Sequence, residues 1–227
     1  HRYGFQPGCG LYTDMNAIRR DEELDNLHSL YVDQWDWEKV IFAEDRTKDY
    51  LKTTVRAIVS SICDTLDALR ARFPQVETQI NREVRFVESQ ELLERYPGLD
   101  AKAREHAIAR ECGTVFIIGI GEKLSDGLPH DRRAPDYDDW SLNGDIIFHN
   151  EVLGGAFEIS SMGIRVDPQS MDSQLKKLGC DARRSLPFHK ALLAGELPLT
   201  IGGGIGQSRL CMLLMGKAHI GEVQSSI

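Results

Sequence analysis

A single arginine follows a cluster of glycines near the end of the sequence. Glycines fill four of the five positions from 202 to 206, and Arg209 comes shortly after them. Glycine has no Cβ, so the backbone there can approach a flat or charged ligand closely and can adopt φ values closed to other residues. The run from Ser208 to Leu214 predicts a helix whose first turn carries Arg209, beside the positive end of the helix dipole. This combination suits a phosphate group.

Two common nucleotide motifs do not fit these residues. The spacing from Gly204 to Arg209 puts arginine where a dinucleotide-binding fingerprint needs its third glycine, and too little chain follows for a second βα unit. Lys217 is followed by alanine and lacks the upstream glycine of a P-loop. A structural glycine-rich turn with a surface arginine remains an alternative explanation of this run alone.

A second polar pattern lies in the strand-like run from Leu30 to Val40. A period of two puts Gln34, Asp36 and Glu38 on one face, while the aromatic residues face the other way. A solvated strand face would explain this pattern. The alternative is a polar floor for an amino acid, with Asp36 facing an ammonium group and Gln34 facing a carboxylate.

Acidic residues embedded in apolar runs form a third candidate group. Mg²⁺ is held by one or two carboxylates together with phosphate and water, so Asp145 and Glu158 on neighbouring strands would suffice. Acids near Asp138 could instead be solvated loop residues. Ser160 and Ser161 are adjacent, so only a bulge would let both face one ligand.

Composition narrows the class of protein. The chain has 227 residues, 41% of them hydrophobic, and a net charge of −8, which argues against a nucleic-acid surface and favours small-molecule partners. The five cysteines are odd in number and lack a CxxC pair, so we expect reduced thiols and a cytoplasmic protein. No apolar run reaches membrane length. The sequence begins at His1 without a signal-like segment, so we expect a piece of a longer protein.

Hydrophobic periodicity predicts the elements. Apolar residues recur at helical spacing from Leu51 to Leu69, which indicates a long amphipathic helix ending before Pro74. Strands are expected over 10–19 and 30–40 as an antiparallel pair, and over 84–87, 115–120, 145–148 and 156–166. Further helices are expected over 90–96, 101–112, 173–178 and 188–193. This order favours an α+β fold, a mostly antiparallel sheet flanked by helices in a single domain, over a doubly wound fold.

These residues, with Arg19 and the segment from His28 to Glu38, resemble the ammonia-dependent asparagine synthetases, the aspartate–ammonia ligase family. The likeness runs from Gly10 to the end and is carried by long specific stretches: Gly10-Leu-Tyr-Thr-Asp-Met15, Ser89-Gln-Glu-Leu-Leu-Glu-Arg-Tyr-Pro97, Lys123-Leu-Ser-Asp-Gly127, Arg133-Ala-Pro-Asp-Tyr-Asp-Asp-Trp140 and Ser160-Ser-Met-Gly-Ile-Arg165. The resemblance implies the catalytic core of class II aminoacyl-tRNA synthetases, closest to the aspartyl branch, and a homodimer.

The resemblance also implies roles for individual residues. Arg19 matches the arginine of the second class II motif, which grips the α-phosphate of ATP and the acyl oxygen. His28 and Ser29 match the loop of that motif that meets ATP, and Arg209, with Gly206 before it, matches the third motif. Asp145 and Glu158 match the acids that bind Mg²⁺ and the nucleotide. Residues matching the aspartate pocket are Gln34, Asp36, Ser161 and Arg165, followed by Ser160 and Asp138.

Two stretches that the family has are missing from the sequence. One is an N-terminal segment with the dimer-forming first motif and further aspartate-binding residues, a lysine among them. The other is a short loop expected between Ser141 and Leu142. Either both are flexible segments absent from this sequence, or this protein has lost them. We expect the former, because lids over active sites are often mobile.

The implied reaction joins L-aspartate and ammonia in an ATP-dependent step through a β-aspartyl adenylate, with Arg19, Arg209 and Asp138 as catalytic residues. Either Asp138 or Asp36 could take the proton from ammonium. A glutamine-dependent enzyme would need a nucleophilic cysteine paired with a base; Cys9 is the one tempting position, and no histidine pattern supports it. Two alternatives are an aspartyl-tRNA synthetase fragment, which would need a basic tRNA-binding module, and a catalytically silent synthetase-like binding module.

Overall fold

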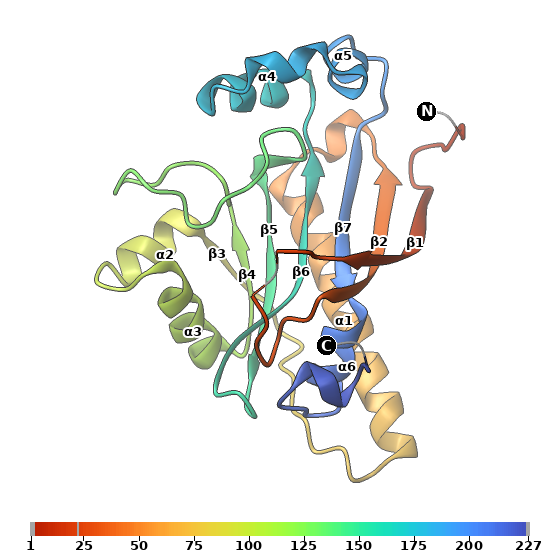
Figure 1. The fold of residues 1–227 in the computed structure, drawn as a ribbon, viewed down its shortest axis with the longest axis vertical. Coiled ribbons are helices and arrows are strands. Elements are labelled where there is room, and N and C mark those ends of the chain that lie inside the picture. The colour runs from red at the N-terminus through yellow and green to blue at the C-terminus, as the bar shows by residue number, and fades with distance from the viewer. Residues whose placement is uncertain (1–2, 22, 226–227) are drawn as a thin grey trace.

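Seven strands form a single mixed sheet in the computed structural model, which describes residues 3–21 and 23–225. The strands lie in the order β1-β2-β7-β6-β5-β4-β3, and every neighbouring pair is antiparallel except the parallel pair β3 and β4 (Figure 1). Their bounds are β1 Gly10–Ile18, β2 Tyr31–Val40, β3 Arg85–Glu88, β4 Thr114–Ile118, β5 Asp138–Asn150, β6 Gly155–Arg165 and β7 Thr200–Gly206.

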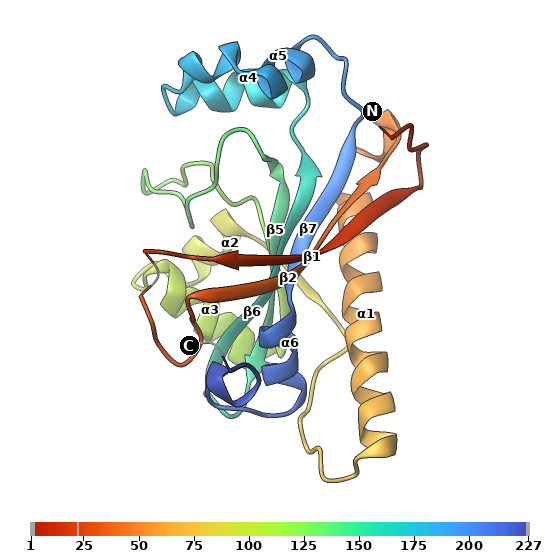
Figure 2. The same cartoon turned by 45° about the vertical axis from the view of Figure 1, so that its right-hand side comes forward.

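Among the described residues, four α-helices pack against the two faces of this sheet and two more pack together beyond one end of it. Their bounds are α1 Lys48–Arg72, α2 Ser89–Arg95, α3 Ala101–Cys112, α4 Pro168–Lys177, α5 Pro187–Leu193 and α6 Gln207–Leu214. The long helix α1 runs along one face (Figure 2). Short 3-10 turns lie at Ala43–Asp45, Asp181–Ser185 and Ile220–Glu222.

Two hydrophobic cores show which helix covers which face. Leu51 of α1 and Leu213 of α6 pack with Phe116 and Met162 of the sheet. Ile108 of α3 packs with Ile117, which follows Phe116 on β4 and therefore points to the opposite face. Helices α2 and α3 thus cover this second face beside β3, β4 and β5. Over β2, β7 and β6 the second face carries the polar residues.

A bulge in β6 changes which of its residues share a face. Ile146 of β5 pairs with Ser160, but the next residue, Ile147, pairs with Glu158, so Ile159 is an extra residue in β6. An inserted residue shifts the alternation of side chains by one position. Glu158 and Ser161 therefore share the second face although they are three positions apart.

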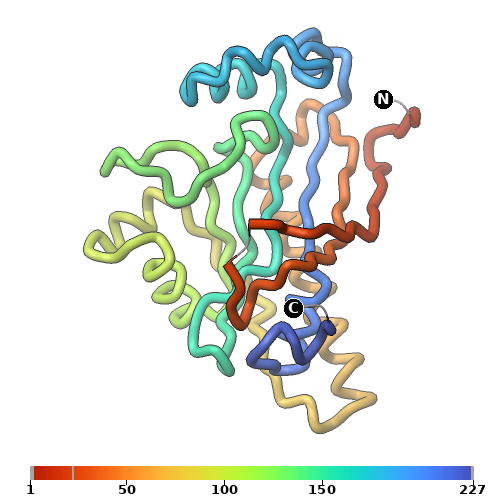
Figure 3. The backbone as a smooth tube through the Cα atoms, in the orientation of Figure 1, coloured from red at the N-terminus to blue at the C-terminus, as the bar shows by residue number. Residues whose placement is uncertain are grey.

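The C-terminal segment lies beside the connection between β1 and β2, as the trace in Figure 3 shows. The Ile220 amide donates to the carbonyl of Asn26 at 2.8 Å, and the Gln224 side chain donates to the Ser29 hydroxyl at 2.6 Å. Residues far apart in the sequence therefore hold this connection in place. Residue 22, between the strands expected over 10–19 and 30–40, lies outside the described residues.

Most elements expected from periodicity are confirmed, including the antiparallel pair of β1 and β2 and the long helix α1. The glycine run is an exception. The glycines would suit a turn with unusual φ values, but they form strand β7. No glycine from 202 to 206 has a positive φ. Neighbouring strands, rather than a turn, explain these glycines. The expected missing loop falls where the pairing of β5 with β6 is irregular, between Asp138 and Asn143.

Candidate active site

A cavity of about 420 Å³ opens on the second face of the sheet. Its walls come from the β1–β2 connection, three strands and the start of α6. The predicted site residues that line it are Arg19, His28, Ser29, Gln34, Asp36, Glu158, Ser161, Gly206 and Arg209. Asp138, Asp145, Ser160 and Arg165 are not part of its wall.

One row of residues crosses the sheet beneath this cavity. Strand pairing places Asp36 beside Gly204, Gly204 beside Ser161, and Ser161 beside Asp145. A Cβ on Gly204 would lie 2.6 Å from an Asp36 carboxylate oxygen and 3.0 Å from the Gln34 amide oxygen. Because Gly204 of β7 has no side chain, the polar side chains of β2 can extend over it. The glycine therefore contributes to the site by leaving room for Asp36 and Gln34.

A methyl group at Gly204 should disturb this floor. We expect Gly204→Ala to raise the KM for the ligand held over Gln34 and Asp36 roughly tenfold, which is the effect of losing about one hydrogen bond to a charged group. Gly206→Ala is the matched variant, because its Cβ would meet Arg209 Cβ at 3.4 Å, an ordinary contact, and lies away from Asp36. Steady-state kinetics on both variants checks this. An equal KM in the two would contradict the role of Gly204.

Arg209 organises the part of the cavity beside the start of α6. Its guanidinium donates to the Glu158 carbonyl at 3.2 Å and lies 2.8 Å from His28 Nε2. His28 Nδ1 lies 2.8 Å from an Asp25 oxygen, so the network assigns the proton to Nδ1 and makes Nε2 the acceptor. Arg19 follows β1 and lines the same cavity. Two arginines from opposite ends of the chain thus face one space.

The first turn of α6 is held by an acid from the sheet. Asp33 of β2 accepts from the Ser208 amide at 3.1 Å and from the Ser208 hydroxyl at 2.7 Å. It thus satisfies an amide at the helix N-terminus. The sequence pattern placed Asp33 on an aromatic packing face, so this contact was missed. It fixes the helix that carries Arg209.

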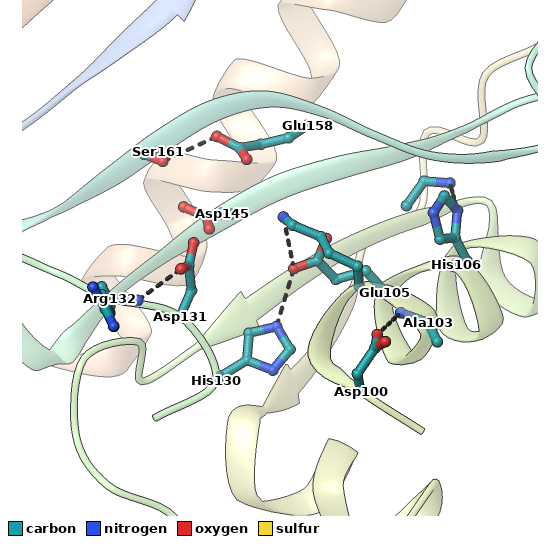
Figure 4. Close-up of polar contacts among 12 residues, drawn as sticks. Asp100, Ala103, Glu105, His106, His130, Asp131, Arg132, Asp145, Glu158 and Ser161 are labelled. Atoms are coloured by element: carbon teal, nitrogen blue, oxygen red, sulfur yellow. Dashed lines mark hydrogen bonds and ion pairs between the residues drawn. The ribbon is translucent and has the colours of Figure 1, made fainter. Parts of the chain in front are cut away.

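Asp145 and Glu158 approach each other from neighbouring strands (Figure 4). The Ser161 hydroxyl donates to Glu158 at 3.1 Å, and Arg133 donates to both carboxylate oxygens of Asp145 and to Ser161 at 3.2 Å. Burial and the Glu158 charge raise the pKa of Asp145 to about 7, although Arg133 opposes the shift. Two like charges this close favour a bound cation.

Two acids with a phosphate nearby are a donor set that fits Mg²⁺, which seldom uses a full protein cage. Residues 3–21 and 23–225 contain no group of three or more His, Cys, Asp or Glu side chains that could hold a metal by themselves. A magnesium ion here would depend on the nucleotide for further ligands.

Arg165 occupies the far end of the site within an acidic cluster. It pairs with Glu38 at 2.9 Å and with Asp138, and its guanidinium lies 4.0 Å from the ring centre of Tyr137. Burial raises the pKa of Asp138 against the pull of Arg165. Burial likewise raises the pKa of Asp36, and Arg165 is close enough to oppose it.

The structure places two of the predicted residues, Ser160 and Asp138, away from the cavity. Ser160 pairs with Ile146 and faces the α1 core, because alternation along β6 sends it opposite to Ser161. Asp138 is buried against Arg165 and does not reach the cavity. Ser29 lines the cavity, but its hydroxyl donates to the Tyr31 carbonyl and accepts from Gln224, so its contacts hold the connection together.

Sequence reasoning assigned no role to Arg133, Glu38 or Tyr137, although each contacts a predicted site residue. Glu38 could have been found, because it shares the period-two face of Gln34 and Asp36. Arg133 and Tyr137 lie in the irregular segment before β5, where periodicity carries no signal.

Known proteins resemble this chain in sequence and in fold. The aspartate-ammonia ligase family matches residues 1–227. The aspartate–ammonia ligase of Clostridium perfringens is 58% identical over the whole chain, which covers 68% of that relative, and the Bacillus thuringiensis enzyme is 60% identical, with 69% of its length covered.

Solved structures share the fold at low sequence identity. Asparaginyl-tRNA synthetase from Pyrococcus horikoshii, complexed with asparaginyl-adenylate, has a TM-score of 0.69 at 14% identity, over 95% of this chain and 51% of that one. Aspartyl-tRNA synthetase from Entamoeba histolytica has a TM-score of 0.68 at 17% identity, over 95% of this chain and 47% of that one. The fold is therefore that of a class II synthetase catalytic core, and the chain belongs to the aspartate–ammonia ligase family.

Proposed function

We propose that this chain carries out the ATP-dependent synthesis of L-asparagine from L-aspartate and ammonia through a β-aspartyl adenylate, releasing AMP and pyrophosphate. The observation that carries the proposal is one cavity lined both by two arginines, Arg19 and Arg209, and by the Gln34–Asp36 pair. Such a cavity can align a triphosphate with an amino acid. Family membership supports the same activity.

The chemistry explains why the site needs both the arginines and the Gln34–Asp36 pair. A carboxylate is a poor electrophile, so its oxygen must first attack the α-phosphorus of ATP. Pyrophosphate leaves, and ammonia then attacks the mixed anhydride carbon and displaces AMP. Catalysis depends mainly on alignment and charge neutralisation at the phosphorus.

We assign the charge neutralisation to Arg19, at the α-phosphate, and to Arg209, held toward the cavity by His28 and the Glu158 carbonyl. Asp145 and Glu158 would hold Mg²⁺, which supplies additional positive charge for the phosphates. Ser161, which lines the cavity between these acids and Gly204, would contact the amino acid.

The aspartate end favours Asp36 over Asp138 as the group that takes a proton from ammonium. Asp36 lines the cavity, whereas Asp138 is buried and paired with Arg165. Burial raises the pKa of Asp36, which makes its carboxylate a stronger base than an exposed aspartate. We assign Arg165 to electrostatic support of this end of the pocket, adjacent to Asp36.

Aspartate-dependent exchange of pyrophosphate into ATP on the full-length protein tests the first step, and addition of ammonia tests the second. Asparagine and AMP are the expected products. Formation of ADP would exclude an adenylate, aminoacyl-tRNA as product would favour the aspartyl-tRNA synthetase alternative, and no exchange at all would favour the silent binding module.

Two properties from the family resemblance remain predictions. Homodimer formation is checked by analytical ultracentrifugation of the full-length protein, and a monomer at micromolar concentration would contradict it. The cytoplasmic location is checked by cell fractionation. No helix in the described part of the chain has the length and apolar character needed to span a membrane.

A further inference from the structure

Arg133 covers the acid that the proposed reaction needs for its metal. The Asp145 side chain is only 5% exposed and is absent from the cavity wall, although its strand neighbour Ser161 belongs to that wall. Arg133 donates to both Asp145 oxygens and to Ser161, so its guanidinium lies over the row that crosses the sheet. A cation in the cavity can reach Asp145 only if this guanidinium leaves.

The main chain around Arg133 is anchored on both sides. His130 is completely buried and its Nε2 lies 3.1 Å from Glu105 of α3 (Figure 4). On the other side, Gln174 of α4 donates to the Pro135 carbonyl at 3.0 Å, and Asp136 pairs with His189 at 2.8 Å. Because these contacts fix the segment, Arg133 can release Asp145 by rotating its side chain without a swing of the loop.

An arginine side chain and a divalent cation cannot bind the same buried carboxylate at the same time. If neither a cation nor Arg133 contacted Asp145, its carboxylate would be buried beside Glu158 without a compensating positive charge, which is energetically costly. Arg133 supplies that compensation. Its side chain is 18% exposed, so part of the guanidinium group already meets solvent.

We propose that Arg133 is an internal competitor of the divalent cation at Asp145, so that metal binding requires its guanidinium to move off the carboxylate. This inference rests on the proposed function, which places the cation at Asp145 and Glu158. It adds a residue that sets the cation affinity of the site. A protein that binds metal only after displacing Arg133 would take up metal with its nucleotide in preference to metal alone, because the nucleotide contributes further ligands.

Titration of Mn²⁺ by electron paramagnetic resonance on the full-length protein, without nucleotide, tests this proposal. We expect Arg133→Gln to bind Mn²⁺ at least about tenfold more tightly than the parent, as follows if Arg133 occupies Asp145 in most molecules. Arg133→Lys keeps the positive charge but replaces the planar guanidinium with a flexible ammonium group, so it should lie between them.

Arg132→Gln is the matched control, because it removes the same charge from the adjacent, exposed position. It should leave Mn²⁺ affinity at the parent value. The gain in Arg133→Gln should disappear in the double variant with Asp145→Asn. Equal affinity in the parent and Arg133→Gln, or a gain that persists without Asp145, overturns the proposal.

Pyrophosphate exchange by the parent protein separates this result from the proposed function. Exchange that depends on aspartate, together with unchanged Mn²⁺ affinity in Arg133→Gln, rejects the role of Arg133 and leaves the proposed function standing. Tighter Mn²⁺ binding in Arg133→Gln without exchange by the parent rejects the proposed function and leaves the competition at Asp145 standing.

Discussion

Arg19→Ala is expected to lower aspartate-dependent pyrophosphate exchange by about a hundred- to a thousandfold, the usual effect of removing one charge-stabilising donor at a reacting centre. Arg19 stands directly after β1, where its amide donates to the Leu30 carbonyl at 2.8 Å and closes the hairpin with β2. That backbone contact does not depend on the side chain. The fold should therefore survive the substitution while the reaction loses a cation at the α-phosphate.

Arg20→Ala is the control for Arg19→Ala. Arg20 carries the same charge one position later, but its side chain is 89% exposed and pairs with Asp21 at the surface. Exchange assays on both variants, with circular dichroism to confirm folding, make the comparison. Near-parental exchange by Arg19→Ala, or an equal loss in both variants, would refute the assignment of Arg19.

Arg165→Met is expected to remove both stability and aspartate-dependent exchange. Arg165 is 9% exposed and holds Asp138, which is 4% exposed, as well as Glu38. Removing one partner of a buried ion pair leaves an uncompensated charge and typically costs about 3–5 kcal/mol. We expect a loss of this size in the free energy of unfolding by urea. The variant should also lose exchange, because Asp36 would face the amino acid without its nearby positive charge.

Two further variants separate these effects. Arg184→Met removes an arginine that also pairs with two acids, Asp172 and Asp181, but at the surface, so its loss of stability should be much smaller. Asp138→Asn added to Arg165→Met removes the stranded charge and should restore part of the stability without restoring exchange. Unfolding of Arg165→Met at the parental urea midpoint would show that the cluster does not stabilise the fold.

Local sequence patterns were sufficient for most of the fold. Apolar residues at helical spacing from Leu51 to Leu69 indicated helix α1, because only one face of that helix is buried. The unbroken apolar run of β4 indicated a strand, because both of its faces are buried. The N-terminal ends of β5 and α4 lie outside the ranges that the sequence patterns predict. Helix α4 begins at Pro168 after the capping residue Asp167, and β5 begins at Asp138 among acids that a solvated loop would also carry.

Strand β7 could not be recognised from its own residues. Glycines carry no side chains, so they show no alternation, and they have low strand propensity. The reason for them lies on β2 and β6: Asp36, Glu38 and Arg165 occupy the space where Cβ atoms would stand. Such a constraint comes from strands distant in the sequence, so a local reading favoured a turn.

The site was predictable in its residue types more than in its geometry. Gln34, Asp36 and Arg209 line the cavity as the resemblance implied, although their roles in catalysis stay predictions. The shared face of Glu158 and Ser161 depends on an extra residue in β6, and no sequence signal marked that bulge. The contact of Arg133 with Asp145 depends on an irregular segment whose path is set by its buried anchors, His130 and Pro135.

The position of β7 in the sheet has a consequence for the order of events during synthesis. Among the strands of residues 3–21 and 23–225 it comes last in sequence, but it lies between β2 and β6. While the ribosome is still making the residues before Thr200, the β1–β2 hairpin has no strand to join it to β6, and the open edges of β2 and β6 could pair wrongly. The arginine of the hairpin and the acids of β5 and β6 can therefore meet only after nearly all of these residues have left the exit tunnel. We expect a nascent chain stalled before β7 to need a chaperone that shields these edges.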